Sequence, residues 1–219
     1  MKFEHNYTYN WENAFRGMRH PLESYAKSDS TFIGNCASLG KNDLNLAQRL
    51  IAAGSPHDKF MRQIFVSVDI NAPLFWWKEM DQYRIGVTTN SCSTMHKLAS
   101  TPITLECFET DDLDQNFELF LQNGARCSME QWNNAIIDGC EFLRQKYLET
   151  KDIRYWKALI RWLPESWLQT RTWTANYEVL RNIYFQRQGH KLTEWHSFCE
   201  WVESLPYAKE LITYTKEEN

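Results

Sequence analysis

The most informative part of this sequence runs from Leu163 to Arg187 and reads LPESWLQTRTWTANYEVLRNIYFQR. Its segment Thr170 to Thr174 is rich in Thr and Trp and predicts a short extended run. The residues that follow predict a helix that contains Asn176 and Arg187 and is closed by Gly189. A helix turns by about 100° per residue, so the eleven steps from Asn176 to Arg187 bring both side chains to nearly one face.

Two amides and one guanidinium on this helix form a set of ligand donors. An Asn amide both donates and accepts hydrogen bonds, and the planar fork of Arg187 suits a phosphate or a carboxylate. The set could hold a heterocycle at one end and an anion at the other, while Asn182, on another face, serves a second ligand or a neighbouring subunit. A structural interpretation is also open, in which Asn176 caps the helix, Asn182 is exposed and Arg187 pairs with an acid.

The chain before this stretch predicts two further helices, a strand and a loop. Apolar residues recur at helical spacing from Asn42 to Ala53, and Gly54 stands where a helix-ending glycine belongs. Alternating apolar residues from Ile64 to Ile70 predict a half-buried strand. The pair Ala72-Pro73 then opens another helix, and the small, hydroxyl-rich run from Gly86 to Thr94 predicts a loop.

The remaining segments are mostly helical by their patterns. We expect helices over residues 113–123 and 129–150, the second opened by a capping box of Ser128 and Gln131. Further helices are expected from Ile153 to just before Pro164 and over residues 193–205. The first forty residues are polar and irregular, apart from a short amphipathic run over residues 11–18.

Composition limits the class of protein. With 219 residues, 43% hydrophobic and 15% aromatic, the chain suits one domain with a substantial core. The formal net charge of −4 and the lack of a Lys/Arg run argue against a general nucleic-acid binder. No segment approaches the roughly 20 apolar residues of a membrane span, and the first residues lack the pattern of a signal peptide. We therefore expect a cytoplasmic protein with no membrane partner.

Cysteines and tryptophans point to packing rather than to metal chemistry. The six cysteines are scattered and lack zinc-binding spacing, so we expect free thiols and no metal site. The ten tryptophans are expected to pack in the core, with stacking on a flat aromatic ligand as the alternative. Their number favours an oligomer, because aromatic residues concentrate at subunit contacts.

The quoted stretch also resembles a known family. Leu-Pro, Thr-Arg, Trp-Thr-x-Asn, an Asn six residues on and an Arg five further are similar to the C-terminal signature of flavin-dependent thymidylate synthases. The resemblance implies that Asn176 and Asn182 contact FAD. It also implies that Arg187 grips the phosphate of dUMP and orients the base for catalysis.

A second patch of resemblance covers residues 54–96 and includes the family's central motif, Arg-His-Arg-x-x-Ser-x-Asn-Glu-x-Ser-x-Arg-Tyr. It implies contacts with FAD at four further positions: His57, Arg84, Ile85 and Asn90. Arg84 would also complement the electronics of the flavin or the base in catalysis. Nucleotide contacts are implied at or beside family positions occupied here by Glu79, Ser91, Ser93 and Arg161.

The central motif is altered in this chain. Its first Arg becomes Gln82, its His becomes Tyr83, its Glu becomes Ser91 and its last Arg becomes Met95, while Glu79 stands where the family has a Gln. At least two cations are lost, and each charge-assisted contact is worth about 1.5–3 kcal/mol. Other cations are available in the sequence to replace them: Arg16, Arg19, Arg62, Lys78 and Arg171.

Simpler interpretations stand beside these roles. His57, next to Pro56, also fits a turn or a cap, and Arg84 fits a surface charge at a helix end. The run over residues 88–94 fits a solvated loop. In its functional interpretation, backbone N–H groups and short hydroxyls of that run form a concavity that binds a phosphate.

For the whole chain, the resemblance implies a single α+β domain with a mixed sheet flanked by helices, assembled as a homotetramer with shared FAD sites. The implied reaction methylates dUMP reductively, with methylenetetrahydrofolate giving the carbon and NADPH reducing the flavin. The altered motif favours a related pyrimidine nucleotide as substrate. Two alternatives stay open: a non-catalytic nucleotide-binding or interaction protein of the same fold, and an unrelated helical domain, in which Arg84, Asn176 and Arg187 would share no cleft.

Overall fold

The computed structural model describes residues 1–216, except for the side chains of Met95 and His96. The chain forms two compact units. The first contains Met1–Ile70, Met80–Asn90 and Arg171–Asn219, and the second contains Asn71–Glu79 and Ser91–Thr170. The prediction of one domain over the whole chain stays a prediction.

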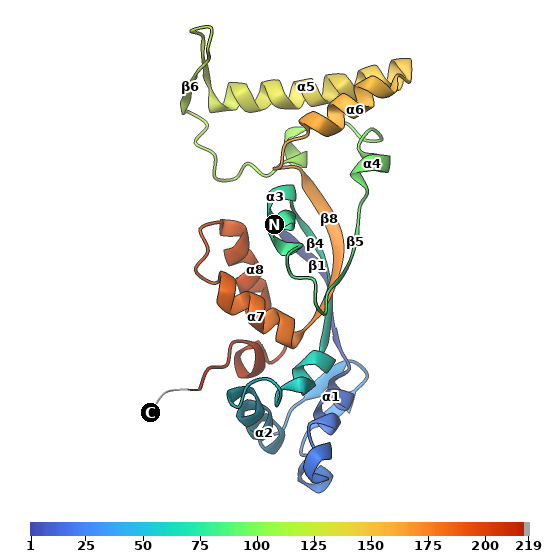
Figure 1. The fold of residues 1–219 in the computed structure, drawn as a ribbon, viewed down its shortest axis with the longest axis vertical. Coiled ribbons are helices and arrows are strands. Elements are labelled where there is room, and N and C mark those ends of the chain that lie inside the picture. The colour runs from blue at the N-terminus through green and yellow to red at the C-terminus, as the bar shows by residue number, and fades with distance from the viewer. Residues whose placement is uncertain (217–219) are drawn as a thin grey trace. The chain divides into compact units, whose positions relative to one another are not determined.

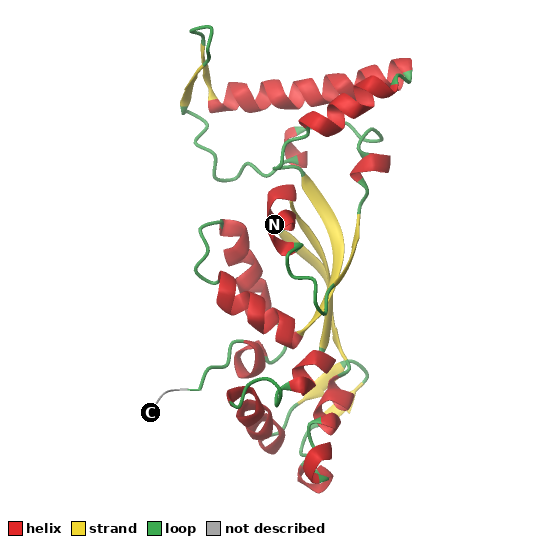
Figure 2. Cartoon of the chain, viewed as in Figure 1, coloured by secondary structure: helices red, strands yellow, loops and turns green. Residues whose placement is uncertain are grey.

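A four-stranded sheet has the strand order β1-β4-β8-β5. Its strands are β1 (Lys2–Tyr9), β4 (Phe65–Pro73), β8 (Leu168–Asn176) and β5 (Thr88–Ser91). Two antiparallel hairpins pair β2 (Thr31–Ile33) with β3 (Cys36–Ser38) and β6 (Glu118–Phe120) with β7 (Arg126–Ser128). The chain combines helices with a four-stranded sheet and two antiparallel hairpins, so the predicted α+β class is confirmed (Figure 2).

Strand β4 confirms the predicted alternation. Val66, Val68 and Ile70 are buried, as expected for one face of a strand that packs on a core. On the other face, the Thr172 hydroxyl of β8 donates a hydrogen bond to the Asp69 carboxylate at 2.5 Å. Hydrophobic and polar faces of the sheet therefore follow directly from the period of two in the sequence.

The N-terminal region is more ordered than its sequence predicts. Strand β1 pairs with β4 at the edge of the sheet, and the hairpin β2–β3 follows, so the expectation of forty irregular residues is wrong. Polar, exposed side chains such as Glu4, His5 and Asn6 hide the strand period in β1. The amphipathic run is confirmed as α1 (Trp11–Gly17), which buries Trp11 and Phe15.

Helices of the first unit form its core. They are α2 (Lys41–Ala52), α7 (Tyr177–Arg187), α8 (Thr193–Glu203) and the short turns η1 (His20–Leu22), η2 (Tyr25–Lys27), η3 (Lys59–Gln63) and η5 (Ala208–Ile212). Helices α7 and α8 lie side by side (Figure 1). The Trp173 ring of β8 meets the Phe198 ring of α8 edge-on at 6.2 Å, and both side chains are fully buried.

The second unit is built around a helix pair. In Figure 2 the hairpin β6–β7 leads directly into the long helix α5 (Met129–Thr150), which packs on α6 (Ile153–Trp162). The predicted capping box is confirmed, because Ser128 accepts from the Gln131 N–H and the Gln131 side chain accepts from the Ser128 N–H. A buried apolar cluster joins the two helices to the preceding turns: Leu98, Ile103, Phe108, Cys140 and Leu159. The short helices α3 (Leu74–Met80), α4 (Thr94–Lys97) and η4 (Leu105–Cys107) complete the chain.

Three predicted segments differ from the structure. The helix predicted to open at Ala72-Pro73 is present as α3 but begins at Leu74, because Ala72 and Pro73 are the last residues of strand β4, which fits the extended backbone favoured before a proline. The run predicted as a loop includes strand β5, which is recruited by pairing with β8. Residues 113–123 are not helical, since this segment forms turns and strand β6.

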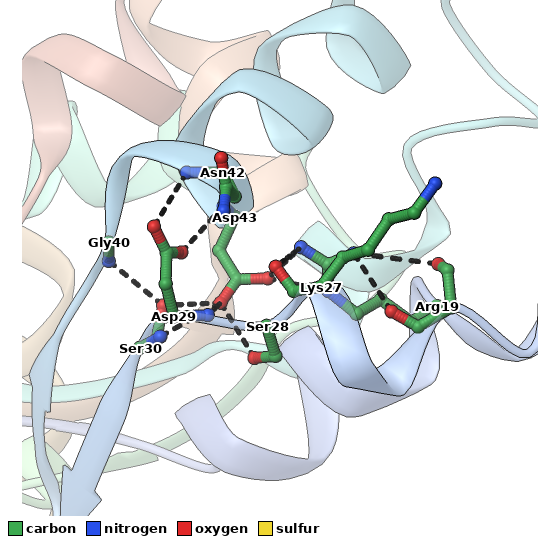
Figure 3. A network of polar contacts seen from close by, with 9 residues as sticks. Arg19, Lys27, Ser28, Asp29, Ser30, Gly40, Asn42 and Asp43 are labelled. Atoms are coloured by element: carbon green, nitrogen blue, oxygen red, sulfur yellow. Dashed lines mark hydrogen bonds and ion pairs between the residues drawn. The ribbon is translucent and has the colours of Figure 1, made fainter.

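A buried ion pair anchors the start of α2 (Figure 3). Asp43 is fully buried, and its Oδ1 accepts from the Nε of Arg19 at 2.7 Å, itself only 4% exposed. The hydroxyls of Ser28 and Ser30 also donate to Asp43, at 2.8 and 2.6 Å. Asp29 in turn accepts from the backbone N–H groups of residues 42 and 43 and so caps the helix.

The sequence predicted no membrane span, no metal site and no disulfide, and the described residues bear on each. Within it, no helix has both the length and the apolar character needed to cross a membrane. No group of three or more His, Cys, Asp or Glu side chains there could hold a metal ion. All six cysteines have free thiols.

Candidate functional site

Arg187 lies in the last turn of α7 and contacts two aromatic rings. Its Nε donates a hydrogen bond to the Tyr83 hydroxyl at 2.8 Å. Its guanidinium carbon lies 5.5 Å from the centre of the Tyr83 ring and 4.5 Å from the centre of the Trp195 ring. Both distances are within the range of a cation–π contact. The aromatic pair therefore holds the guanidinium plane in one place.

Tyr83 links three segments of the first unit. Its hydroxyl accepts from Arg187 and donates to the Gln186 side chain at 3.1 Å, so both of its hydrogen-bonding roles are used. Its ring meets the Trp195 ring of α8 edge-on at 6.3 Å. Tyr83 is the residue that stands where the similar family has a His, so this departure is in direct contact with the predicted phosphate ligand.

Asn176 caps α7 instead of lying within it. Its backbone is extended, and its Oδ1 accepts from the Val179 N–H at 3.0 Å, which confirms the capping interpretation. The expectation that one helical face carries both Asn176 and Arg187 is wrong, because the helix begins at Tyr177. The sequence pattern could not separate a residue at the helix cap from one inside the helix.

The segment after Tyr83 packs closely on this cap. Gly86 has φ of +73°, and a Cβ added there would lie 3.0 Å from the Asn176 Nδ2 and 3.2 Å from the Val179 Cγ2. Only glycine combines this backbone conformation with so close an approach. The structure thus brings the segment of Arg84 and Ile85 against the start of α7, and Tyr83 against its end.

The other predicted FAD ligands of this segment are exposed. The Nε of Arg84 donates to the Asp81 carbonyl at 3.1 Å, and Ile85 is 92% exposed. Asn90 is exposed on the edge strand β5. Their contacts with FAD stay predictions.

Asn182 and His57 lie apart from that segment by all described contacts. Asn182 is exposed on α7, as the structural interpretation expects. His57 is exposed and lines a groove of about 600 Å³ formed with η1, α2 and η3. Arg84, Asn176 and Arg187 are not among the residues that line this groove.

The predicted nucleotide ligands other than Arg187 belong to the second unit. Glu79 is half-buried on α3, Ser91 is exposed on β5, and Ser93 is half-buried just before α4. Arg161 is exposed on α6. The side chain of Met95, which replaces the motif's last Arg, lies outside the described residues. Nucleotide contacts of these residues stay predictions.

Most cations that could replace those lost from the motif are already used. Arg19, Arg62, Lys78 and Arg171 form ion pairs, in that order with Asp43, Glu178, Glu165 and Asp81, at 2.6–2.8 Å. Arg16 donates to the Asn13 side chain at 2.8 Å. Sequence reasoning counted these side chains as available and missed Trp195 as a partner of Arg187, because neither fact follows from spacing along the chain.

Comparison with known proteins identifies the fold. No protein-family model and no curated protein matches the sequence. Two solved structures of the flavin-dependent thymidylate synthase ThyX from Helicobacter pylori, with FAD and dUMP, each align with a TM-score of 0.67 and 19% identity over 96% of both chains. A UMP/dUMP methylase, PolB from Streptomyces cacaoi, bound with 5-Br dUMP, aligns with a TM-score of 0.59 and 12% identity, over 93% of this chain and 87% of that one. The fold expected from the resemblance is confirmed, and an unrelated helical domain is the wrong interpretation.

Proposed function

We propose that this chain is a divergent flavin-dependent thymidylate synthase-like enzyme. It binds FAD and methylates dUMP or a related pyrimidine nucleotide, with methylenetetrahydrofolate as carbon donor and NADPH as reductant. The observation that carries the proposal is the packing of the 83–86 segment on both ends of α7, since this joins the two sequence patches that resemble the family. The shared fold supports it.

The donors in this segment fit a flavin dinucleotide. Gly86 packs closely on the Asn176 cap, so the 83–86 segment is held beside the start of α7, and its residues 84–86 are exposed. Arg84 adds a guanidinium, and Asn90 adds an amide among exposed hydroxyls on β5. Bound FAD would supply the reducing equivalents. The residues of the chain would bind it, orient it and exclude water from its reactive face.

Arg187 is the proposed phosphate ligand of the nucleotide. Guanidinium and phosphate form two parallel hydrogen bonds when the Arg is held in one plane. Tyr83 and Trp195 hold that plane, and so reduce the entropy that Arg187 loses on binding. A tyrosine in place of the motif's His changes the surroundings of this phosphate ligand. Glu79 and Met95, at positions where the family contacts the nucleotide, favour a nucleotide other than dUMP as the preferred substrate.

A homotetramer is part of the proposal, and exposed apolar side chains support it. On the helix pair of the second unit, Phe142, Ile153 and Trp162 are 60%, 55% and 74% exposed. Trp132 on the same pair is 43% exposed. Large aromatic residues on a helical surface favour contact with another subunit.

The test is an absorption spectrum of the purified protein after incubation with excess FAD and removal of unbound cofactor. We expect a stoichiometric flavin band that shifts when dUMP or another pyrimidine nucleotide is added. Arg187→Ala should abolish the nucleotide-dependent shift and keep the flavin band, whereas Lys191→Ala, an exposed cation just beyond α7, serves as the control. Unchanged nucleotide affinity in Arg187→Ala would remove the assigned role.

A second candidate is a non-catalytic nucleotide-binding or interaction protein with the same fold. It is favoured by one observation, namely that four of the five cations available to restore the motif are committed to ion pairs. A colourless protein that binds a pyrimidine nucleotide without taking up FAD would select this candidate.

A further inference from the structure

The groove beside His57 has an apolar floor. It is lined by side chains from the end of α1, from η1, from α2 and from η3, and its volume is about 600 Å³. Met18 and Phe60 are buried at its base, and Leu46 and Leu50 are half-buried. Leu22 is 85% exposed at its edge. A ligand with aliphatic stretches would gain contact area here.

The rim of the same groove is cationic. Arg49 and Lys59 line it with two histidines, His20 and His57, and none of its lining residues is an Asp or a Glu. Neither Arg49 nor Lys59 forms an ion pair with any described residue. This concentration of positive charge stands out on a chain with a net charge of −4.

A second hollow continues the cationic rim. Its volume is about 790 Å³, and it shares Leu22, Ser24, Leu46 and Arg49 with the groove. It adds Lys27, while Glu23 is its single acidic lining residue. The two hollows together present apolar surface with cations at intervals, which suits an extended chain of anionic groups.

We propose that this groove binds the glutamyl tail of the folate co-substrate, an inference that rests on the proposed function. Each γ-linked glutamate carries two methylene groups and one carboxylate. The methylenes fit the floor near Leu46 and Leu50, and the carboxylates pair with Arg49 and Lys59. A tail of several glutamates reaches the neighbouring hollow and Lys27.

The experiment compares folates with one and with five glutamates. Their dissociation constants for the full chain, loaded with FAD where it takes up FAD, are measured by titration calorimetry at low and high salt. We expect the pentaglutamate to bind about tenfold more tightly at low salt, and this advantage to shrink at high salt because exposed charge pairs are screened.

Two double variants with the same change of charge separate the groove from the rest of the surface. In Arg49→Gln/Lys59→Gln, the ratio of the two dissociation constants should fall to near one, with the monoglutamate affinity nearly unchanged. Lys157→Gln/Lys191→Gln, whose side chains are exposed elsewhere, should keep the ratio. Circular dichroism of each variant checks that it is folded.

Three results would overturn the inference. The first is equal affinity of the wild type for both folates, or no affinity for either. The second is an unchanged ratio in the groove variant. The third is a loss of FAD affinity in that variant with folate binding intact, which would assign the cations to the dinucleotide phosphates. Failure of the proposed function is distinguished because it would remove the flavin band and the nucleotide response of the wild type.

Discussion

The buried Arg19–Asp43 pair gives the sharpest prediction about stability. Asp43→Ala removes a carboxylate that is fully buried and accepts five hydrogen bonds, from the Arg19 Nε, two Ser hydroxyls and two backbone N–H groups. Arg19, at 4% exposure, would then keep its charge with only carbonyl and hydroxyl partners. Removing one partner of a buried ion pair costs about 3–5 kcal/mol. We expect a loss of free energy of unfolding in that range.

The assay is urea unfolding at pH 7, followed by circular dichroism and by tryptophan fluorescence. Glu149→Ala is the control, since it breaks an exposed Lys146–Glu149 pair at 3.2 Å and should change the free energy of unfolding by less than about 1 kcal/mol. The double variant Arg19→Met/Asp43→Leu should recover much of the lost stability, because it removes both charges together. A loss below about 1 kcal/mol in Asp43→Ala would show that the buried pair contributes no more than an exposed one.

The same pair predicts a dependence on pH. Burial by itself raises the pKa of Asp43, but hydrogen bonds from Ser30, Ser28 and Arg19 outweigh it and hold the pKa below its usual value. A lowered pKa means that the carboxylate stabilises the fold at neutral pH and that this contribution is lost as the pH falls through the folded-state pKa. The wild type should therefore lose more stability than Asp43→Ala on acidification, as measured by unfolding at successive pH values.

Three more changes test the site and the second unit. Tyr83→Phe removes the hydroxyl that accepts a hydrogen bond from Arg187, so the dissociation constant for a nucleoside monophosphate should rise about 2–10-fold in calorimetry, while that for the nucleoside stays unchanged. An equal effect on both dissociation constants would argue against a role at the phosphate. Gly86→Ala introduces a Cβ at φ of +73°, which should lower the free energy of unfolding in urea by about 1–2 kcal/mol and weaken FAD uptake. Wild-type values of both quantities would contradict the close packing. Hydrogen bonds from Arg144 lower the pKa of Glu141 to about 2, so Glu141→Gln should have a lower free energy of unfolding than the wild type at neutral pH. This difference in unfolding free energy should shrink between pH 4.5 and about 2, and a constant difference would be inconsistent with that pKa.

Local sequence signals predicted the elements that are stabilised by their own residues. The capping box at Ser128 and Gln131 placed the start of α5, and the helix-ending glycine at residue 54 placed the end of α2 to within about two residues. The alternation in β4 placed its buried face correctly. In these cases, the interactions that decide the structure lie within a few residues of one another.

Elements that depend on a distant partner were missed. Strand β1 has polar residues on both faces and is a strand because β4 pairs with it, and β5 is a strand because β8 does. The apolar residues over 113–123 resembled a helix, yet Phe117 is exposed just before the hairpin and Phe120 is exposed in its strand β6. Hydrogen bonds between strands far apart in the sequence outweigh weak local preference.

The candidate site likewise combines features that depend on local sequence with features that depend on distant partners. The amino-acid sequence supplies the residue types at Asn176, Arg187 and the altered motif, and their order indicates the fold. Packing in three dimensions makes Asn176 a cap, brings Gly86 against it, and places Tyr83 and Trp195 on Arg187. Side-chain identity is local information, whereas these contacts join residues up to 104 positions apart and exist only once the sheet and helices have packed.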